Sequence, residues 1–517
     1  MGVGMPWITD SVAGQAPPIS PDRPAVAIAK EPPLSWREFR ELEMRYASAL
    51  KAAGIQPGDR VGMLLKNSVD YIALIFAIAR VGGIAVRLNW RLTARELEFI
   101  IDDSGARLLL LDADLAGSVE PIRGSIPVER YVMRGGGATS WAEPFDAFTD
   151  VEISTGFPEP SLDEPASLMY TSGTTGRPKG AIWTHGNNLW FGAMQALRWR
   201  FDATTVAMTC GPLFHAGGWE AMLLAAMANH GTAITYPSGS FDMLDYLADC
   251  RAQNATDILL YSFMAPDLVR MENCAELVPA TLRRIVCGGD TLMPWVYEAF
   301  AQKLPGVELV QVYGLTEGGA ITCCLDGADA DRAGSVGRTL PFTDAKVLDG
   351  TGDPCPPDEV GALWVRSPAV SPGYWRRPEA DVETFVDGWC RTGDLASIDD
   401  QGFITLGGRA KDMIRSGGEN IYPAEVEAVL TTAPGVADAA VIGVPDARWH
   451  EVGCAVLVCD PGESLDVEEV RAFCTERLAK YKVPRYLIVV DELPRTASGK
   501  VKKFELRDAY RHLGESG

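Results

Sequence analysis

The residues best suited to chemistry lie together in one segment, from Tyr170 to Gly180. It reads Tyr-Thr-Ser-Gly-Thr-Thr-Gly-Arg-Pro-Lys-Gly and follows an apolar run typical of a strand. Its glycines let a backbone approach a ligand closely, its hydroxyls can donate hydrogen bonds, and Lys179 adds a positive charge. Because Lys179 is followed by glycine rather than by serine or threonine, the segment is not a Walker A loop. This composition predicts a polyphosphate-binding loop, with a plain surface turn as the alternative.

A basic cluster near the C-terminus stands out because the chain as a whole is acidic. The 517 residues carry 69 acidic and 47 basic side chains, a formal net charge of −22. Such a surface repels nucleic acid and anionic lipid, so we expect neither as a partner. From Lys480 to Arg511, however, nine basic residues outnumber four acidic ones, a net charge of +5. The cluster is either a solvated helix face or the place where an anionic ligand is met.

Four further segments follow the first in order along the chain. They are Tyr313-Gly314-Leu315-Thr316-Glu317, Trp389-Cys390-Arg391-Thr392-Gly393-Asp394, Gly408-Arg409-Ala410-Lys411-Asp412 and Pro494-Arg495-Thr496-Ala497-Ser498-Gly499-Lys500. Together with Tyr170–Gly180 they resemble the motifs of the adenylate-forming superfamily, which includes acyl- and aryl-CoA synthetases, nonribosomal adenylation domains and firefly luciferase. The resemblance covers nearly the whole chain, and chance agreement at all five segments is not credible.

The resemblance implies a reaction in two steps. A substrate carboxylate attacks the α-phosphorus of ATP and releases pyrophosphate, and a thiol then attacks the acyl adenylate and releases AMP. It implies ATP, Mg²⁺ and coenzyme A as cofactors and a small carboxylic acid as substrate. Because both steps bring anions together, catalysis must come largely from positioning and charge stabilisation.

The resemblance also assigns the nucleotide site. The β- and γ-phosphates would be held by Thr171, Ser172, Gly173, Thr174, Thr175, Gly176 and Lys179. The rest of the ATP cleft would be lined by Gly288, Gly289, Asp290, Tyr313, Gly314, Thr316, Asp394 and Arg409. Within this set, Tyr313 would stack on adenine and Asp394 would accept hydrogen bonds from both ribose hydroxyls. Glu317 would help to hold Mg²⁺, and Thr171, Glu317 and Lys500 are the expected catalytic residues.

Lys500 resembles the adenylation lysine that bridges the substrate carboxylate and ATP, although an isolated Gly-Lys pair would be taken for a solvated charge. Lys411 resembles the pivot on which a small C-terminal domain turns after adenylation. That rotation would withdraw Lys500 and bring Gly417 and Gly418 towards the thiol, where glycines let the thin pantetheine arm of CoA pass. An ordinary turn is the alternative for the two glycines.

The acid itself is the least determined part. By resemblance, His215 lies where the acyl pocket meets the thiol tunnel, and we expect it to position the substrate rather than act as a base. The expected pocket residues are His215, Gly217, Trp219, Gly288 and Gly314, together with Tyr261–Ala265. Gly217 and Gly218 suggest space for a bulky or long acid, unless Trp219 fills it. No cationic side chain is evident in these segments, so a second carboxylate is not favoured, and fatty, aromatic and polycyclic acids stay open.

An acid–CoA ligase is the leading functional hypothesis. A ligase that loads a carrier-protein thiol, or that stops at the adenylate, is the alternative. The glycines after the hinge and the lack of an appended carrier domain favour CoA. A silent ATP- or acyl-binding regulator would be expected to have lost Lys500, Glu317 or Asp394, and all three are present. Nothing positively separates a luciferase-like oxygenase from the ligase.

The elements that must position these residues alternate between strand and helix patterns. Short buried strands are expected at Val61–Leu65, Arg107–Leu111, Ser167–Tyr170, Ile285–Cys287, Leu309–Tyr313 and Ala362–Val365. Ser35 and Glu38 form a capping box at the start of a helix that stops at Gly54, and another helix is expected at Val69–Ala79. This alternation predicts an α/β fold with largely parallel sheets. The resemblance adds a β-rich subdomain and a small mobile α+β C-terminal domain.

Paired glycines at Gly407-Gly408 mark the best domain boundary, which predicts an N-terminal adenylation domain at 1–408 and a C-terminal domain at 409–517. Eleven cysteines without a Cys-x-x-Cys spacing, and only five histidines, predict reduced thiols in the cytoplasm rather than a zinc site. The longest apolar stretch, Tyr71–Val86, is broken by Arg80 and predicts a buried helix rather than stable insertion in a membrane. The start of the chain lacks the basic residues and following apolar run of a signal peptide. The sequence does not decide whether the protein forms a homodimer.

Overall fold

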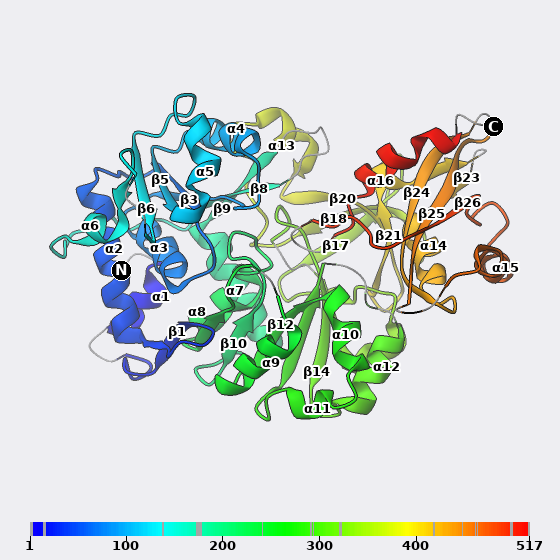
Figure 1. Cartoon of the computed structure of the whole chain (residues 1–517), viewed down its shortest axis with the longest axis horizontal. Helices are drawn as coiled ribbons and strands as arrows, with labels where there is room; N and C mark the ends of the chain where they lie inside the picture. The colour runs from blue at the N-terminus through cyan, green and yellow to red at the C-terminus, as the bar shows by residue number, and fades with distance from the viewer. Residues whose placement is uncertain are drawn as a thin grey trace.

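The computed structural model describes residues 4–13, 17–136, 139–171, 178–239, 241–289, 292, 294–319, 323–416, 419–446, 448–460, 462, 464–496 and 500–514. Over these residues the chain forms four β-sheets with helices packed around them, so the predicted α/β fold is confirmed (Figure 1). We refer to them as the N-terminal, central, bridging and C-terminal sheets.

The N-terminal sheet is parallel except at one edge, where β8 and β9 run antiparallel. In spatial order its strands are β7 (Glu143–Pro144), β6 (Arg130–Arg134), β5 (Leu108–Asp112), β3 (Arg60–Leu64), β4 (Ile84–Arg87), β8 (Pro165–Thr171) and β9 (Lys179–Thr184). The strands predicted near residues 61–65, 107–111 and 167–170 are β3, β5 and β8.

The central sheet is parallel from β14 to β1 and antiparallel at both edges. In spatial order its strands are β16 (Arg338–Thr339), β15 (Cys323–Asp326), β14 (Glu308–Tyr313), β13 (Arg284–Gly288), β12 (Asp257–Tyr261), β10 (Val206–Thr209), β11 (Thr232–Thr235), β1 (Pro24–Ile28) and β2 (Leu34–Ser35). The strands predicted near residues 285–287 and 309–313 are β13 and β14.

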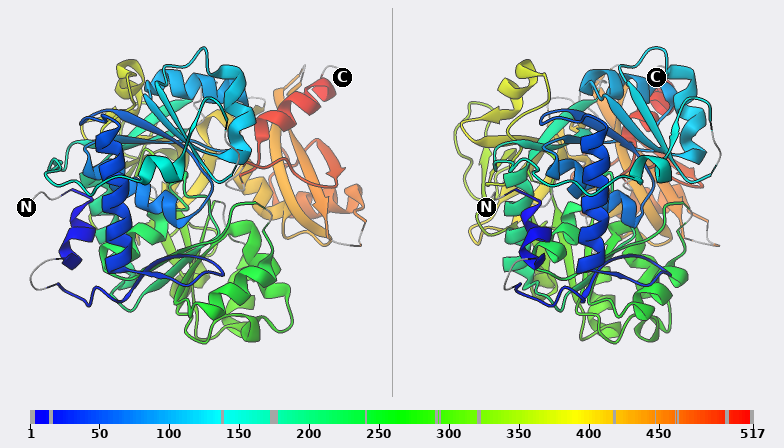
Figure 2. Two further views of the ribbon diagram at one scale, coloured as in Figure 1. Left: turned by 60° about the vertical axis from the view of Figure 1, so that its left-hand side comes forward. Right: turned by 90° about the vertical axis from the view of Figure 1, so that its left-hand side faces the viewer.

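The other two sheets are mostly antiparallel. The bridging sheet contains β17 (Asp344–Leu348), β18 (Gly361–Arg366), β20 (Trp389–Ile398), β19 (Phe385–Val386) and β21 (Ile404–Arg409). The C-terminal sheet contains β23 (Glu419–Ile421), β22 (Ile414–Ser416), β25 (His450–Cys459), β24 (Val436–Asp446) and β26 (Tyr486–Val490). Figures 1 and 2 show the C-terminal sheet, in orange and red, to one side of the N-terminal and central sheets.

The helices of the described residues begin and end as follows: α1 (Trp7–Asp10), α2 (Trp36–Ala52), α3 (Val69–Arg80), α4 (Ala94–Ser104), α5 (Ala116–Val119), α6 (Phe145–Thr149), α7 (His185–Trp199), α8 (Ala225–Ala228), α9 (Met243–Ala252), α10 (Ala265–Arg270), α11 (Cys274–Leu277), α12 (Pro294–Lys303), α13 (Pro378–Thr384), α14 (Pro423–Leu430), α15 (Val467–Arg477) and α16 (Lys503–Tyr510). The predicted capping box of α2 is confirmed, because Ser35 Oγ accepts the Glu38 N–H and the Glu38 carboxylate accepts the Ser35 N–H.

Helix α3 explains the long apolar stretch of the sequence. Every residue from Tyr71 to Arg80 is buried, and the core cluster around them takes members from both the N-terminal and the central sheet, such as Met63 and Val286. A helix that is apolar on all sides is buried on all sides. In agreement with that packing, the described residues include no helix long and apolar enough to cross a bilayer.

Candidate active site

The carboxyl ends of the parallel strands of two sheets face each other, and side chains at these ends hydrogen-bond across the gap. Thr171, at the end of β8, donates from Oγ1 to Oε1 of Glu317, which follows β14, at 2.8 Å. The Tyr374 hydroxyl donates to the same Glu317 oxygen at 3.0 Å, and Trp183 Nε1 donates to the Thr316 carbonyl at 3.0 Å. Ligands of open α/β sheets bind at such carboxyl edges, so this junction is the candidate site.

Lys179 lies at the same place, because the register of β8 and β9 sets it opposite Thr171. Its Nζ stands 5.1 Å from the centre of the Tyr374 ring, a cation–π distance. The predicted phosphate loop therefore begins and ends beside Glu317. Its residues Ser172 to Gly176, like Asp290, lie outside the described residues.

A second group of side chains surrounds Asp394, on β20 of the bridging sheet. The Tyr313 hydroxyl donates to Asp394 Oδ2 at 2.5 Å, and Arg409 Nε lies 2.8 Å from Asp394 Oδ1. Burial and then the Asp394 carboxylate raise the pKa of Tyr313 well above its usual value, so the phenol stays a donor. Burial lowers the pKa of Arg409, but Asp394, Tyr313, Glu317 and Asp412 together outweigh burial, and the pKa is raised. The structure thus holds Asp394 as an oriented carboxylate.

His215 lies on the segment that follows β10, and its Nδ1 accepts the Gly217 N–H at 3.1 Å. Burial first, and then the charges of Lys500 and Arg87, lower the pKa of His215 to about 4. Lys500 is therefore close enough for its charge to act on His215. A neutral imidazole at neutral pH fits the predicted role in positioning better than a role as proton donor.

Gly218, three residues after His215, is required by the close approach of the backbone rather than by an open pocket. A Cβ on Gly218 would stand 2.1 Å from the Pro212 carbonyl oxygen, and one on Gly288 would stand 2.9 Å from a methyl group of Val312. Trp219 is fully buried and packs edge-on against Phe76, with ring centres 6.0 Å apart. Gly218 is thus no measure of the size of the acid, and the expectation that its missing side chain leaves space was wrong.

Two family profiles match the chain. That of the AMP-binding enzymes matches residues 15–375, and that of the AMP-binding enzyme C-terminal domain matches residues 425–500. The chain belongs to the AMP-binding enzyme family. The resemblance to adenylate-forming enzymes is confirmed.

Individual members of the family align with this AMP-binding enzyme over almost its full length. A feruloyl-CoA synthase from Amycolatopsis sp is 37% identical over 478 residues, which cover 92% of this chain and 94% of that protein. The fatty acid–[acyl-carrier-protein] ligase ScoC of Streptomyces coeruleorubidus is 36% identical over 512 residues, 95% of this chain and 94% of that protein. The crystal structure of ATP-bound MatB from Rhodopseudomonas palustris superposes with a TM-score of 0.89 at 30% identity, covering 99% of this chain and 100% of that one.

The oxygen donors of this AMP-binding enzyme fit a magnesium ion held jointly with phosphates. Glu317 and Thr171 place a carboxylate and a hydroxyl beside the phosphate loop. Mg²⁺ commonly takes one or two carboxylates, substrate phosphates and water as ligands. Within the described residues, no group of three or more acidic, histidine or cysteine side chains could hold a metal ion.

Sequence reasoning missed a buried ion pair beside the His215 segment. Arg87 ends β4 and Glu220 begins a π-helical turn, Glu220–Leu224, and both side chains are 1% exposed. Arg87 Nη2 lies 3.1 Å from Glu220 Oε2 and also donates to the Leu213 carbonyl. The available signal was one charged residue in each of two apolar runs, but the residues are 133 positions apart and nothing local pairs them.

The predicted hinge lies between two sheets. Arg409 ends β21 of the bridging sheet, Lys411 lies in the 3₁₀ turn Ala410–Asp412, and Ile414 begins β22 of the C-terminal sheet. The Asp412 carboxylate pairs with Arg507 Nη2 of α16 at 2.6 Å, which ties the far side of the turn to the C-terminal sheet's own helix. Gly417 and Gly418 lie outside the described residues.

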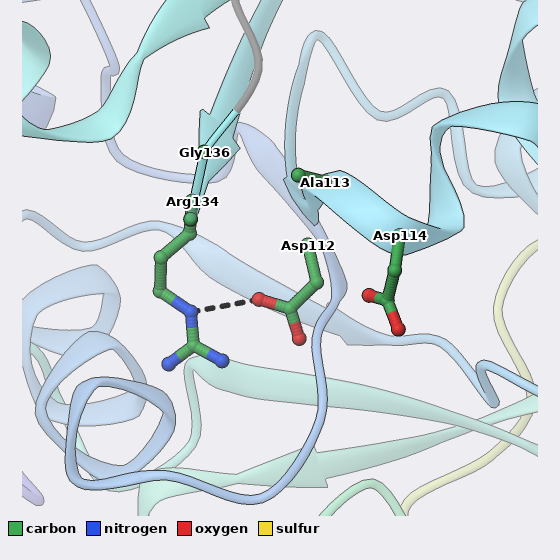
Figure 3. A pocket seen from close by; sticks show the side chains of 6 residues that line it. Asp112, Ala113, Asp114, Arg134 and Gly136 are labelled. Atoms are coloured by element: carbon green, nitrogen blue, oxygen red, sulfur yellow. Dashed lines mark hydrogen bonds and ion pairs between the residues drawn. The ribbon is translucent and has the colours of Figure 1, made fainter.

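A separate cavity of about 350 Å³ opens at the carboxyl ends of β5 and β6. Figure 3 shows Arg134 pointing at Asp112, and the two are joined at 2.7 Å. Asp112 also accepts the Lys66 N–H at 2.7 Å. Asp112 and Arg134 pair with each other and Asp114 pairs with Lys66, so each charged side chain that lines this cavity already has a partner. Asp112 also anchors the loop that leads from β3 into α3.

Proposed function

We propose that this AMP-binding enzyme is an ATP-dependent carboxylic acid–CoA ligase. It converts acid and ATP to an acyl adenylate and pyrophosphate, and then converts the adenylate and CoA to an acyl-CoA and AMP. The observation that carries the proposal is the convergence on one site of the Thr171–Glu317 hydrogen bond, the Asp394 network and the charge of Lys500 beside His215.

In the first step, the residues of this site bind and neutralise anions. Lys179 and the loop from Thr171 hold the β- and γ-phosphates. Asp394 accepts hydrogen bonds from the ribose hydroxyls, and the Tyr313 ring stacks on adenine. Lys500 bridges the acid carboxylate and the α-phosphate, so that two anions can approach. Glu317, oriented by Thr171 and Tyr374, would hold Mg²⁺, and a bound Mg²⁺ would supply positive charge for the pyrophosphate leaving group.

The second step uses the same site with the C-terminal domain rotated. We place the domain boundary at 408/409 and the pivot at Lys411. The 3₁₀ turn Ala410–Asp412 between two sheets supports this, because a short turn can absorb a change in backbone dihedral angles. Gly417 and Gly418 then line the path of the pantetheine arm.

We favour an acid with one carboxylate, as expected from the lack of cationic side chains in the pocket segments of the sequence. Besides Lys500, the charge of Arg87 acts on His215, and Glu220 already pairs with Arg87. Arg87 is therefore not an unpaired partner for a second carboxylate, whereas the charge of Arg91 acts on Tyr261 of the expected pocket. Fatty, aromatic and polycyclic acids all satisfy this requirement, and the feruloyl-CoA synthase relative acts within the aromatic class.

A ligase that loads a carrier protein is the second candidate, and the similarity to ScoC over 95% of the chain is the observation that favours it. For the cellular compartment we propose the cytoplasm, because all eleven cysteines are unpaired, as a reducing compartment requires.

The test is a pyrophosphate-release assay over a panel of acids, with and without CoA, in which products are identified by mass. Acyl-CoA formation from at least one acid is the expected result. Pyrophosphate release that ignores CoA and is followed by loading of a carrier protein would favour the second candidate. Absence of pyrophosphate release with every acid class named above would refute both.

A further inference from the structure

The Arg87–Glu220 pair joins two layers of the molecule. Arg87 comes from the N-terminal sheet, and Glu220 lies on the segment that follows β10 of the central sheet. Burial raises the pKa of Glu220 and Arg87 acts against that rise, so each charge depends on the other. The Glu220 carbonyl is held in addition by Gln195 Nε2 at 2.8 Å.

Asn67 hydrogen-bonds to the other end of the segment that carries His215, at Gly211 and Leu213. Its Nδ2 donates to the Gly211 and Tyr236 carbonyls, both at 2.9 Å, and its Oδ1 accepts the Leu213 N–H at 2.9 Å. Asn67 is 7% exposed and follows Lys66, the residue whose N–H is held by Asp112 of the cavity in Figure 3. The N-terminal sheet therefore reaches across and fixes the segment from Gly211 to Glu220 at both ends.

This segment carries two of the residues expected in the acyl pocket. It includes His215 and Trp219, and it ends in wide helical turns in which the Ala221 N–H bonds to the Ala216 carbonyl at 3.0 Å and the Leu224 N–H bonds to the Trp219 carbonyl at 3.1 Å. A π-helical turn is an uncommon geometry that often marks a functional site. The Arg87–Glu220 pair lies at the first residue of this turn, directly after Trp219.

We propose that Arg87, Glu220 and Asn67 are positioning residues that hold His215 and Trp219 in the arrangement that selects the acid. The inference rests on the proposed function, since it concerns the acyl pocket of that reaction. None of the three residues takes part in the chemistry. They act through the backbone of the segment from Gly211 to Glu220.

A purely structural role is the competing explanation, and the chain contains a matched control for it. Arg80 and Glu43 form a second buried pair, with side chains 8% and 0% exposed and Arg80 Nε 2.7 Å from Glu43 Oε1. That pair joins α2 and α3 and also involves Asp10 of α1, not the His215 segment. Well-packed apolar replacement of a whole buried pair is often tolerated, whereas removal of one partner is not, so both pairs are replaced as pairs.

The experiment compares Arg87→Met/Glu220→Met with Arg80→Met/Glu43→Met in the pyrophosphate-release assay. For each folded variant, the KM for the acid, the KM for ATP and the order of preference over the acid panel are measured. We expect the Arg87/Glu220 variant to raise the acid KM about tenfold or more and to change the order of preference, because small misplacements are costly in a pocket. We expect the ATP KM to stay within about twofold, and the control variant to change neither.

An unchanged acid KM and an unchanged order of preference would overturn the inference, as would a parallel rise in both KM values or an equal effect in the control. If the double variant does not fold, Asn67→Ala carries the test, because it removes three hydrogen bonds without unpairing a charge. The same selective rise in acid KM is then required, and its absence overturns the proposal. A wild-type protein that activates no acid would refute the proposed function itself, which is a distinct result.

Discussion

Replacement of Asp394 by asparagine tests the nucleotide site most directly. A carboxylate offers about four acceptor positions on two oxygens. In the structure one oxygen accepts the Tyr313 hydroxyl and the other pairs with Arg409, which leaves one position on each oxygen. Those two positions match the two ribose hydroxyls of ATP. Asparagine keeps one acceptor oxygen, but its NH₂ group replaces the other oxygen and places hydrogen-bond donors opposite the donors that the carboxylate accepted.

The expected magnitude follows from the kind of bond that is lost. A hydrogen bond to a charged group contributes about 1.5–3 kcal/mol, and about 1.4 kcal/mol corresponds to a factor of ten. The wild-type enzyme should therefore prefer ATP over 2′-deoxy-ATP by roughly 10- to 100-fold in kcat/KM. Asp394→Asn should raise the KM for ATP by a similar factor, and the preference for the 2′-hydroxyl should largely disappear.

The assay is ATP–pyrophosphate exchange with the preferred acid, titrated with either nucleotide. Tyr313→Phe is the matched control, because it removes one neighbour of Asp394 but leaves both ribose acceptors in place. This control should keep the preference for ATP over 2′-deoxy-ATP even if its KM changes. Thermal unfolding of each variant checks that the protein is folded.

One result would refute the reasoning. If Asp394→Asn, folded and active, still preferred ATP over 2′-deoxy-ATP as strongly as the wild type, Asp394 would not accept the ribose hydroxyls. The Tyr313–Asp394–Arg409 network would then serve only to join the bridging sheet to the central sheet.

Three further predictions concern separate parts of the molecule. Lys500→Ala should cut adenylation severely but spare thioester formation from a supplied acyl adenylate. Gly418→Leu should spare adenylation but cut thioester formation. Equal loss of both partial reactions in either variant would contradict the role assigned to that residue. Glu317→Gln should raise the Mg²⁺ concentration needed for half-maximal pyrophosphate release, and an unchanged Mg²⁺ titration would remove Glu317 from the metal site. Burial lowers the pKa of His185 to about 4 from 6.5, so the unfolded chain takes up a proton first as the pH falls. The free energy of unfolding should therefore fall by about 3 kcal/mol between pH 6.5 and 4 on account of His185, and chemical denaturation of His185→Gln, which should lack this contribution, checks it.

Features that depend on neighbouring residues were accessible from the sequence. The predicted helix Val69–Ala79 is α3, Val69–Arg80, because its apolar run and its cap are local. The Gly/Pro-rich stretch Asp349–Gly361 is another local feature, because its turn residues join β17 to β18, which pair antiparallel. The phosphate loop, Glu317 and Asp394 were found as short strings of residues, and the family match supports the chemistry expected of them.

Features that depend on residues far apart in the chain could not be predicted from the sequence. Arg87 and Glu220 pair across 133 positions, and Asn67 meets Gly211 across 144. Each of these side chains alone would be a buried polar group with a high energetic cost, so only the folded arrangement gives it a reason. The hydrogen bond from Tyr313 to Asp394 is of the same kind, because the sequence assigns both residues to the nucleotide but not to each other.

Two contacts between the C-terminal sheet and the segments around the central sheet are weak, as the proposed rotation of the C-terminal domain requires. Arg270 of α10 lies 3.4 Å from Asp460, and the two side chains are 47% and 34% exposed. Arg495 lies over the ring of Phe263 at 5.7 Å, where Phe263 is 41% exposed. Exposed ion pairs and cation–π contacts each contribute only about 0–1 kcal/mol, so breaking these two costs little.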